Sequence, residues 1–256
     1  MTQRPPALSH LTSAEAAESA SRGDVVLIPL GALEQHGPAM PLGTDTIRAE
    51  DICARVAARL SGGVVIAPTL PIGVSPHHLA FPGTVTLTTT TFAAVVREVV
   101  LGLHRQGWTR ILAVTGHGGN NATLTTVAQD LLGSHPALRF AWTPLTAVVP
   151  DVVARAGVSK VHGHCGEAET SQMLFVAPHL VREDLAEPGT TRPDELSDLA
   201  RLARSTTYPA LSLRYDELSA NGVLGDPTAA SADLGAQIVT TATDRICDFI
   251  TRWSAI

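Results

Sequence analysis

The sequence predicts one α/β domain over residues 1–256, in which a mostly parallel β-sheet carries helices on both faces. Three observations lead to this prediction. Short apolar runs, typical of buried strands, alternate with longer segments whose apolar residues recur at helical spacing. Hydrophobic residues make up 45% of the chain, which is enough for a substantial core. Polar clusters directly follow the apolar runs, as expected where a site lies at the carboxyl ends of parallel strands.

Each predicted element rests on its own pattern. The expected strands are the apolar runs at 25–30, 64–67 and 110–115, with a weaker run at 138–142. Helical spacing predicts five helices, at 46–60, 90–106, 120–132, 166–175 and 230–253. The stretch 185–211 combines acidic residues with prolines. It is therefore predicted to be irregular, and could serve as a lid or as an oligomer contact.

The composition excludes several classes of function. A net charge of −6 without a basic patch argues against nucleic acids and anionic membranes as partners. No stretch approaches the roughly 18 apolar residues that span a bilayer, and the N-terminus lacks the apolar core of a signal peptide. The three cysteines, Cys53, Cys165 and Cys247, form neither a CxxC pattern nor a disulfide framework. We therefore expect a cytoplasmic protein.

Metal-binding side chains follow the first predicted strand. Glu34 and His36 are two residues apart, so in extended backbone they project to the same side. The prolines and glycines between them and Asp45 can turn the chain so that Asp45 returns to the same space. A mixed Glu/His/Asp set suits Zn²⁺, Mn²⁺ or Fe²⁺. The alternative is a polar loop in which the aspartate only caps a helix.

Two further clusters lie at comparable places. His117 follows the strand at 110–115 within a glycine-rich loop, which could instead cradle a phosphate but lacks the Walker and GxGxxG patterns. The segment 162–170 opens a predicted helix with histidines, Cys165 and two glutamates. The helix dipole alone would account for one of those glutamates. Cys165 could be a nucleophile, although a small buried cysteine is the commoner outcome.

Six motifs are spread over nearly the whole chain. They are Leu30–Pro38 (LGALEQHGP), Pro41–Asp45 (PLGTD), Phe81–Thr84 (FPGT), Gly116–Asn120 (GHGGN), His164–Ser171 (HCGEAETS) and Gly222–Pro227 (GVLGDP). In this order they resemble the motifs of the creatininase (creatinine amidohydrolase) family. The resemblance implies a three-layer α/β/α sandwich, often assembled as a homo-oligomer such as a hexamer. It also implies a site with two divalent metal ions, Zn²⁺ or Mn²⁺ with Fe²⁺ as a third option, that hydrolyses an amide C–N bond.

The resemblance assigns roles to individual residues. Five residues match metal ligands, with Asp45 as the bridge between the ions: Glu34, His36, Asp45, His117 and Glu169. His164 matches a candidate proton-transfer group, which Glu167 would orient. Four further residues are expected to contact the substrate, namely His78, Gly118, Gly119 and Asn120.

The chain also departs from creatininase proper. Gly119 stands where creatininase proper has an acidic ligand, so Glu169 is expected to serve the second ion, with Glu167 as the second choice. Cys165 stands where the family usually has an alanine. Creatininase proper surrounds its small substrate with tryptophans, whereas the corresponding half of this chain has only Trp142. The sequence therefore argues against creatinine as the substrate. We expect a metal-dependent amidohydrolase acting on a formamide, a lactam or a similar small amide. The alternatives are a metal-dependent peptidase of the mycofactocin-maturation type and a catalytically silent ligand-binding member.

Overall fold

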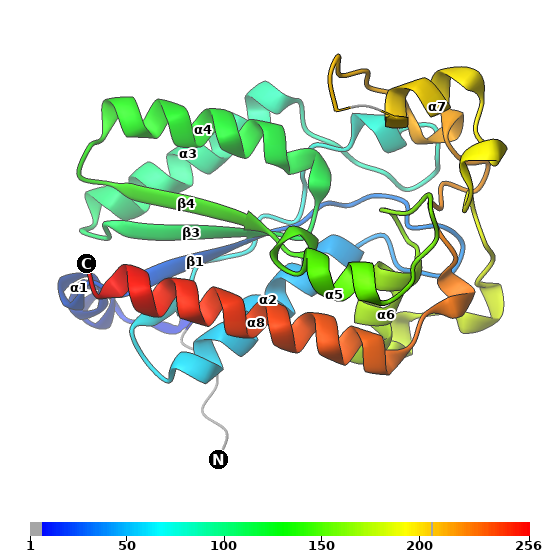
Figure 1. Ribbon diagram of the computed structural model, residues 1–256. Helices are drawn as coiled ribbons and strands as arrows, with labels where there is room; N and C mark the ends of the chain where they lie inside the picture. The colour runs from blue at the N-terminus through cyan, green and yellow to red at the C-terminus, as the bar shows by residue number, and fades with distance from the viewer. Residues whose placement is uncertain (1–6, 206) are drawn as a thin grey trace.

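The computed structural model of the chain describes residues 7–205 and 207–256. Its centre is a parallel sheet in the order β2-β1-β3-β4. The strands are β1 (Val25–Leu30), β2 (Val64–Ile66), β3 (Arg110–Thr115) and β4 (Arg139–Pro144). In Figure 1, β1, β3 and β4 run side by side in the middle of the molecule. The predicted mostly parallel sheet is confirmed.

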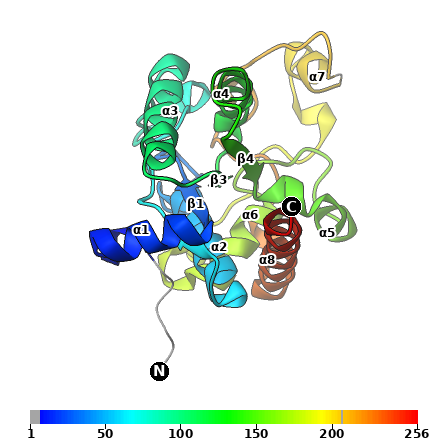
Figure 2. The same cartoon turned by 90° about the vertical axis from the view of Figure 1, so that its left-hand side faces the viewer.

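Helices cover both faces of this sheet. One face carries α3 (Thr89–Arg105) and α4 (Asn121–Ser134), and the other carries α2 (Thr44–Leu60) and α8 (Ala232–Ser254). Figures 1 and 2 show these two helix layers with the sheet between them. The helix α6 (Glu167–Val176) packs against α8. The arrangement confirms the three-layer α/β/α sandwich.

Alternation along β1 explains why both faces bury a core. Val25 and Leu27 pack into the cluster under α2 and α8, whereas Val26 and Ile28 pack into the cluster under α3 and α4. Because successive side chains of a strand point to opposite faces, a strand buried on both sides must be apolar at every position. The uninterrupted run at 25–30 meets that requirement.

The parallel register brings the ends of β1 and β3 together. Leu30 pairs with Thr115, the last residue of each strand. Glu34 and His117 therefore leave the sheet from neighbouring points of the same edge, although they are far apart in sequence. This is the edge at which α/β folds place their sites.

Within the described residues, three α-helices were not predicted from the sequence. They are α1 (Ser13–Arg22), α5 (Pro150–Arg155) and α7 (Asp198–Ser205). The helix α7 lies inside the stretch predicted to be irregular, so that prediction is wrong for these residues. Ser197 accepts a hydrogen bond from the backbone N–H of Ala200 at 3.2 Å, which satisfies one of the free donors at the start of α7. Within the described part of the chain, no helix has both the length and the apolar character to span a membrane.

Candidate metal centre

Five side chains meet beyond the carboxyl ends of β1 and β3, and we call them the carboxylate–histidine cluster. Glu34 and His36 follow β1, His117 follows β3, and Asp45 and Glu169 lie in the first turns of α2 and α6. All of them except Glu169 are at most 4% exposed. The cluster therefore holds three carboxylates and two histidines in a space largely closed to bulk water, where nearby positive charge must offset the carboxylates.

Asp45 lies between two groups of ligand atoms. Its Oδ2 is 3.1 Å from Nδ1 of His117, which is also 3.3 Å from Oε1 of Glu34. Its Oδ1 is 3.6 Å from Nε2 of His36, which is also 3.7 Å from Oε2 of Glu169. We call these groups the His117 half-site and the His36 half-site. Each carboxylate oxygen of Asp45 faces a different half-site, as a residue bridging two ions would.

Several atoms of the cluster lack hydrogen-bond partners in the described structure. They are Oε2 of Glu34, Nε2 of His36 and Oδ2 of Asp45, all fully buried. A buried polar atom without a partner costs free energy, and a ligand normally accounts for it. Both nitrogen and oxygen donors are present, which is the donor set of Zn²⁺ and Mn²⁺ sites. The residues present therefore fit divalent metal ions.

The second ring nitrogen of each cluster histidine supports the same interpretation. Nδ1 of His36 lies 3.1 Å from the carbonyl oxygen of Glu34, and Nε2 of His117 lies 2.9 Å from that of Val74. When the ring is neutral, as in a metal ligand, an N–H that donates to a carbonyl fixes the tautomer and leaves a lone pair on the other nitrogen. In both residues that free nitrogen faces the carboxylates. The tautomers are therefore those of metal ligands.

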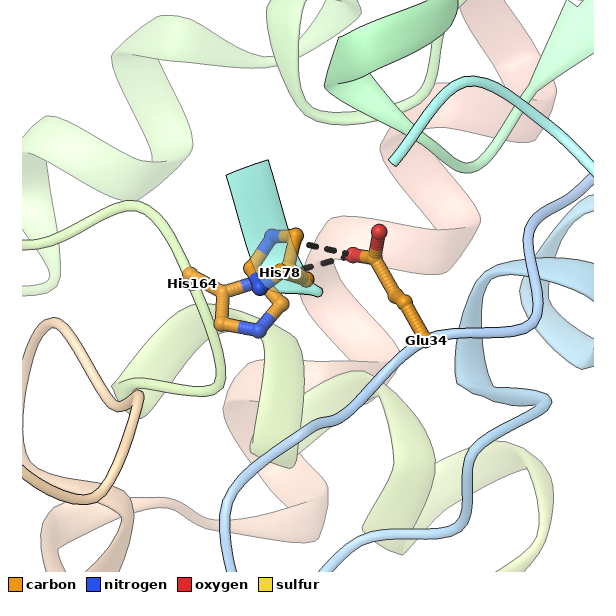
Figure 3. Close-up of side chains that lie close together, drawn as sticks. All are labelled: Glu34, His78 and His164. Atoms are coloured by element: carbon orange, nitrogen blue, oxygen red, sulfur yellow. Dashed lines mark ion pairs between the residues drawn. The ribbon is translucent and has the colours of Figure 1, made fainter. Parts of the chain in front are cut away.

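Two more histidines face Glu34, as Figure 3 shows. Oε1 of Glu34 lies 3.5 Å from Nε2 of His78 and 3.7 Å from Nδ1 of His164. Nε2 of His164 lies 2.9 Å from the carbonyl oxygen of Gln35, to which it can donate. Nδ1 of His78 accepts from the side-chain amide of Gln35 at 2.8 Å. His164 therefore presents a lone pair to the cluster, whereas His78 presents an N–H.

Ligand atoms of further histidines are close enough to contribute. Four overlapping sets of three ligand atoms lie within 4.8 Å of one another. They are Glu34/His36/Asp45, Glu34/His77/His117, Glu34/His78/His164 and His36/His164/Glu169. The geometry thus leaves His164 as a group that could bind an ion as well as transfer a proton. His77 stacks on the ring of His117, with 5.7 Å between the ring centroids.

The electrostatics of the cluster favour positive charge. Burial by itself would lower the pKa of His36, but the carboxylates of Asp45, Glu169 and Glu34 outweigh burial and raise that pKa to about 9. The pKa of His117 is likewise raised, despite burial, by Glu34 and Asp45. Burial and the neighbouring His36 lower the pKa of His164 to about 3. Burial and neighbouring histidines also lower the pKa of His78, so His78 and His164 are neutral at pH 7.

We expect metal affinity to rise with pH up to about pH 9. In the metal-free protein His36 is protonated below its pKa of about 9, and an ion must displace that proton to bind. Each displaced proton changes the apparent dissociation constant about tenfold per pH unit. Calorimetric titration of Mn²⁺ at pH 6, 7 and 8, in buffers of different ionisation enthalpy, measures both the affinity and the protons released. A dissociation constant independent of pH would contradict this expectation.

Close backbone packing explains two glycines of the site. A Cβ atom on Gly116 would lie 2.1 Å from the carbonyl oxygen of Asp45, so Gly116 lets α2 approach the end of β3. A Cβ atom on Gly119 would lie 2.2 Å from the carbonyl oxygen of Val74 and 2.3 Å from Nε2 of His117. Gly119 thus cannot carry an acidic side chain on this backbone, which leaves Glu169 as the carboxylate beside Asp45 in the His36 half-site.

Two predicted site residues have other contacts than expected. The side chain of Asn120 accepts from the N–H of Val74 at 3.0 Å and donates to the carbonyl of Gly31 and the hydroxyl of Thr115, both at 3.1 Å. Asn120 is fully buried and is not among the residues that line the cavity, so its side chain holds the loops together and does not face the space open to a substrate. Glu167 accepts from the backbone N–H of Ser159 at 2.9 Å. The group that orients His164 is therefore the Gln35 carbonyl, contrary to the expectation for Glu167.

Cys165 lies behind the cluster. Its thiol donates to the carbonyl oxygen of His36 at 2.6 Å, and it is fully buried. Burial raises the pKa of this thiol well above its usual range. A buried, protonated thiol is a poor nucleophile, which favours the structural alternative for Cys165.

Sequence reasoning missed four residues of the site, one of which is His77, a member of one of the sets of ligand atoms above. Gln35 contacts both His78 and His164, and its place between two candidate ligands was the available signal. Arg48 contacts Asp45 and Glu169, and its position one helical turn after Asp45 was the signal. The ring of Tyr215 lies 4.0 Å from that of His78, between centroids, and no pattern in the sequence indicated it.

A cavity of about 690 Å³ opens onto the cluster. Glu34, Asp45, His117 and Glu169 line one part of it, together with His78, His164, Gly118 and Gly119. Residues of α5, of the short 3-10 helix before it and of the loop after it form an apolar wall: Ala147, Pro150, Val153, Ala154 and Val158. The cavity is as large as pockets that hold drug-sized ligands.

Residues 9–250 match the family model of creatininase, described as creatinine amidohydrolase. The chain belongs to the creatininase family. It is 36% identical to a mycofactocin precursor peptide peptidase of Mycolicibacterium smegmatis, over 90% of this chain and 85% of that protein. It is 28% identical to the creatinine amidohydrolase of Pseudomonas putida, over 95% of each chain.

Solved creatininase structures share the fold. A manganese form has a TM-score of 0.77 at 25% identity, over 96% of this chain and 97% of that chain. A variant of zinc–zinc type has a TM-score of 0.79 at 26% identity, over 96% of each chain. The chain is therefore a member of a metal-dependent hydrolase family. Within that family it is distinct from creatininase proper.

Proposed function

We propose that this protein hydrolyses an amide C–N bond with two divalent metal ions held by the carboxylate–histidine cluster. The observation that carries this proposal is the position of Asp45, whose two oxygens face two separate groups of ligand atoms. Glu34, Asp45 and His117 would hold one ion, and His36, Asp45 and Glu169 the other. Two such ions supply an activated water and polarise the substrate carbonyl.

The two neutral histidines provide complementary functions beside the ions. Nδ1 of His164, which carries a lone pair, would accept a proton from the attacking water and return it to the leaving amine. Nε2–H of His78 would donate to the carbonyl oxygen of the substrate. Gln35 contacts both rings and holds them in these opposite tautomers. The pair is therefore neutral before the reaction, and His164 would carry a positive charge only between taking the proton from water and returning it to the leaving amine.

We further propose that the substrate is a peptide. A cavity of about 690 Å³ with an apolar wall exceeds what a formamide or small lactam would fill. The relative that is 36% identical is a peptidase, which supports the peptidase alternative over a small-amide substrate. Hydrolysis of a small amide is the second candidate, since the 28% identical relative acts on creatinine.

Metal content and hydrolysis together test the proposal. We expect close to two transition-metal ions per chain by plasma mass spectrometry after dialysis against metal-free buffer. Chelation should abolish hydrolysis, and Zn²⁺ or Mn²⁺ should restore it. Mass spectrometry of a short-peptide library, with creatinine, formamides and lactams in parallel, decides between the substrates. Cleavage of small amides alone would contradict the peptide proposal. A protein that binds no metal and cleaves nothing would contradict the hydrolase itself.

A further inference from the structure

One buried cation lies beside the His36 half-site. Arg48 is 2% exposed and follows Asp45 by one turn of α2. Its NH1 nitrogen is 3.3 Å from Oδ1 of Asp45, and it also donates to Oε1 of Glu169. These two carboxylates are the acidic ligands of the His36 half-site. A permanent positive charge is thus built in where a divalent ion would bind.

Arg48 has few ways to move away from this position. Its Nε and NH2 nitrogens donate to Oε1 of Gln172 at 3.2 and 3.1 Å, and NH1 is 3.4 Å from the carbonyl oxygen of Gly116. Gln172 is itself fixed, since its Nε2 donates to the carbonyl of Ala168 at 3.0 Å. A guanidinium that is buried and hydrogen-bonded on all three nitrogens keeps both its charge and its position.

The two half-sites differ in their distance from this charge. The contacts of Arg48 with the cluster go to Oδ1 of Asp45 and to Glu169, both in the His36 half-site. Oδ2 of Asp45, Glu34 and His117 form the other half-site, on the far oxygen of Asp45. Arg48 also compensates one of the three carboxylates of the cluster. The two negative charges that remain offset only half of the positive charge of two divalent ions. Repulsion falls with distance and acts mainly on the nearer ion.

The ligand oxygen of Glu169 is held by a hydrogen bond that does not involve Arg48. Oε2 of Glu169, the oxygen that faces His36, accepts from the backbone N–H of Cys165 at 2.7 Å. A neutral residue at position 48 would therefore remove the charge but leave this oxygen in place. This separates the electrostatic effect of Arg48 from an effect on ligand geometry.

We infer that Arg48 makes the two metal sites unequal: the ion at His117 binds tightly, and the ion at His36 binds weakly and exchanges. This rests on the proposed two-metal function. Arg48 acts on the nearer ion by its charge, from its place against the carboxylates of Asp45 and Glu169. While the site lacks metal, the guanidinium also offsets part of the repulsion among the three carboxylates.

Stepwise titration of Mn²⁺ into the metal-free protein tests the inference. We expect two binding steps in the wild type, and Glu169→Gln should abolish only the weaker one. Arg48→Gln and Arg48→Met should strengthen the weaker step about tenfold or more. Arg48→Lys keeps the charge and should leave that step within about threefold of the wild type. Arg59→Gln removes a charge from the exposed end of α2, where Arg59 pairs with Asp244, and should leave both steps unchanged.

The other outcomes of the titration contradict either the proposed function or the role of Arg48. A wild type that binds no Mn²⁺ would contradict the proposed function itself. Two ions of equal affinity, or a weaker step that is unchanged or lost in Arg48→Gln, would overturn only the role of Arg48. If the neutral variants unfold without metal, thermal unfolding with Mn²⁺ replaces the titration, and a larger stabilisation than in the wild type is expected. A variant unfolded even at saturating Mn²⁺ would make Arg48 a structural residue and overturn the inference.

Discussion

Replacing Asp45 by asparagine is expected to abolish binding of at least one metal ion and to lower hydrolysis about a thousandfold or more. The carboxylate faces both half-sites, with one oxygen 3.1 Å from Nδ1 of His117 and the other 3.6 Å from Nε2 of His36. Asparagine offers one neutral oxygen and an NH₂ group that only donates, so it cannot bridge two cations. Metal analysis and turnover of the purified variant measure both effects.

A conservative change on the same helix provides the control for Asp45→Asn. Asp51→Asn alters a carboxylate that pairs with Arg55 on the outer part of α2, so it should keep both ions and full turnover. The Asp45 variant should remain folded, because it removes one of three mutually repelling carboxylates. Full metal content together with full turnover in Asp45→Asn would show that Asp45 is not the bridge.

Replacing His164 by alanine is expected to leave two ions bound and to lower kcat by roughly 10²- to 10⁴-fold, the usual contribution of a proton-transfer group. Nδ1 of His164 faces the cluster with a lone pair, while Nε2 is 2.9 Å from the Gln35 carbonyl. Its pKa of about 3 keeps it neutral at pH 7. Metal content and steady-state kinetics of the same preparation distinguish proton transfer by His164 from metal binding by His164, the two functions that the geometry allows.

An exposed histidine outside the cavity provides the control for His164→Ala. His179 is exposed and does not line the cavity, so His179→Ala should change kcat by less than about threefold. Loss of an ion from the His164 variant would make His164 a metal ligand. Unchanged metal content with unchanged kcat would remove it from catalysis altogether.

Much of the candidate site was predictable because its residues lie in short segments next to strands. Glu34 and His36 follow the apolar run of β1 within six residues, and His117 follows β3 within two. A parallel sheet brings such segments together at one edge whatever their separation in sequence. The structure places all five predicted ligands in one cluster, while their occupancy by metal stays a prediction.

Other parts of the site depended on contacts that no local pattern reports. Asn120 lies in a motif like its neighbours, yet three buried partners use its amide and keep it from the cavity. Arg48 reaches Glu169, which is 121 residues away, only because α2 and α6 pack together. Tyr215 arrives from an irregular segment whose path the sequence did not specify.

The sequence by itself determined the parallel α/β sandwich and the set of candidate metal ligands. Uninterrupted apolar runs specify strands buried on both faces, and ligand-type residues directly after them must emerge at the same edge. Only the tertiary structure decided which carboxylate oxygen faces which histidine, which tautomer each histidine holds, and that a buried arginine adjoins one half-site. These properties depend on distances of a few ångströms between residues far apart in the chain, and such distances are fixed only when the helices pack.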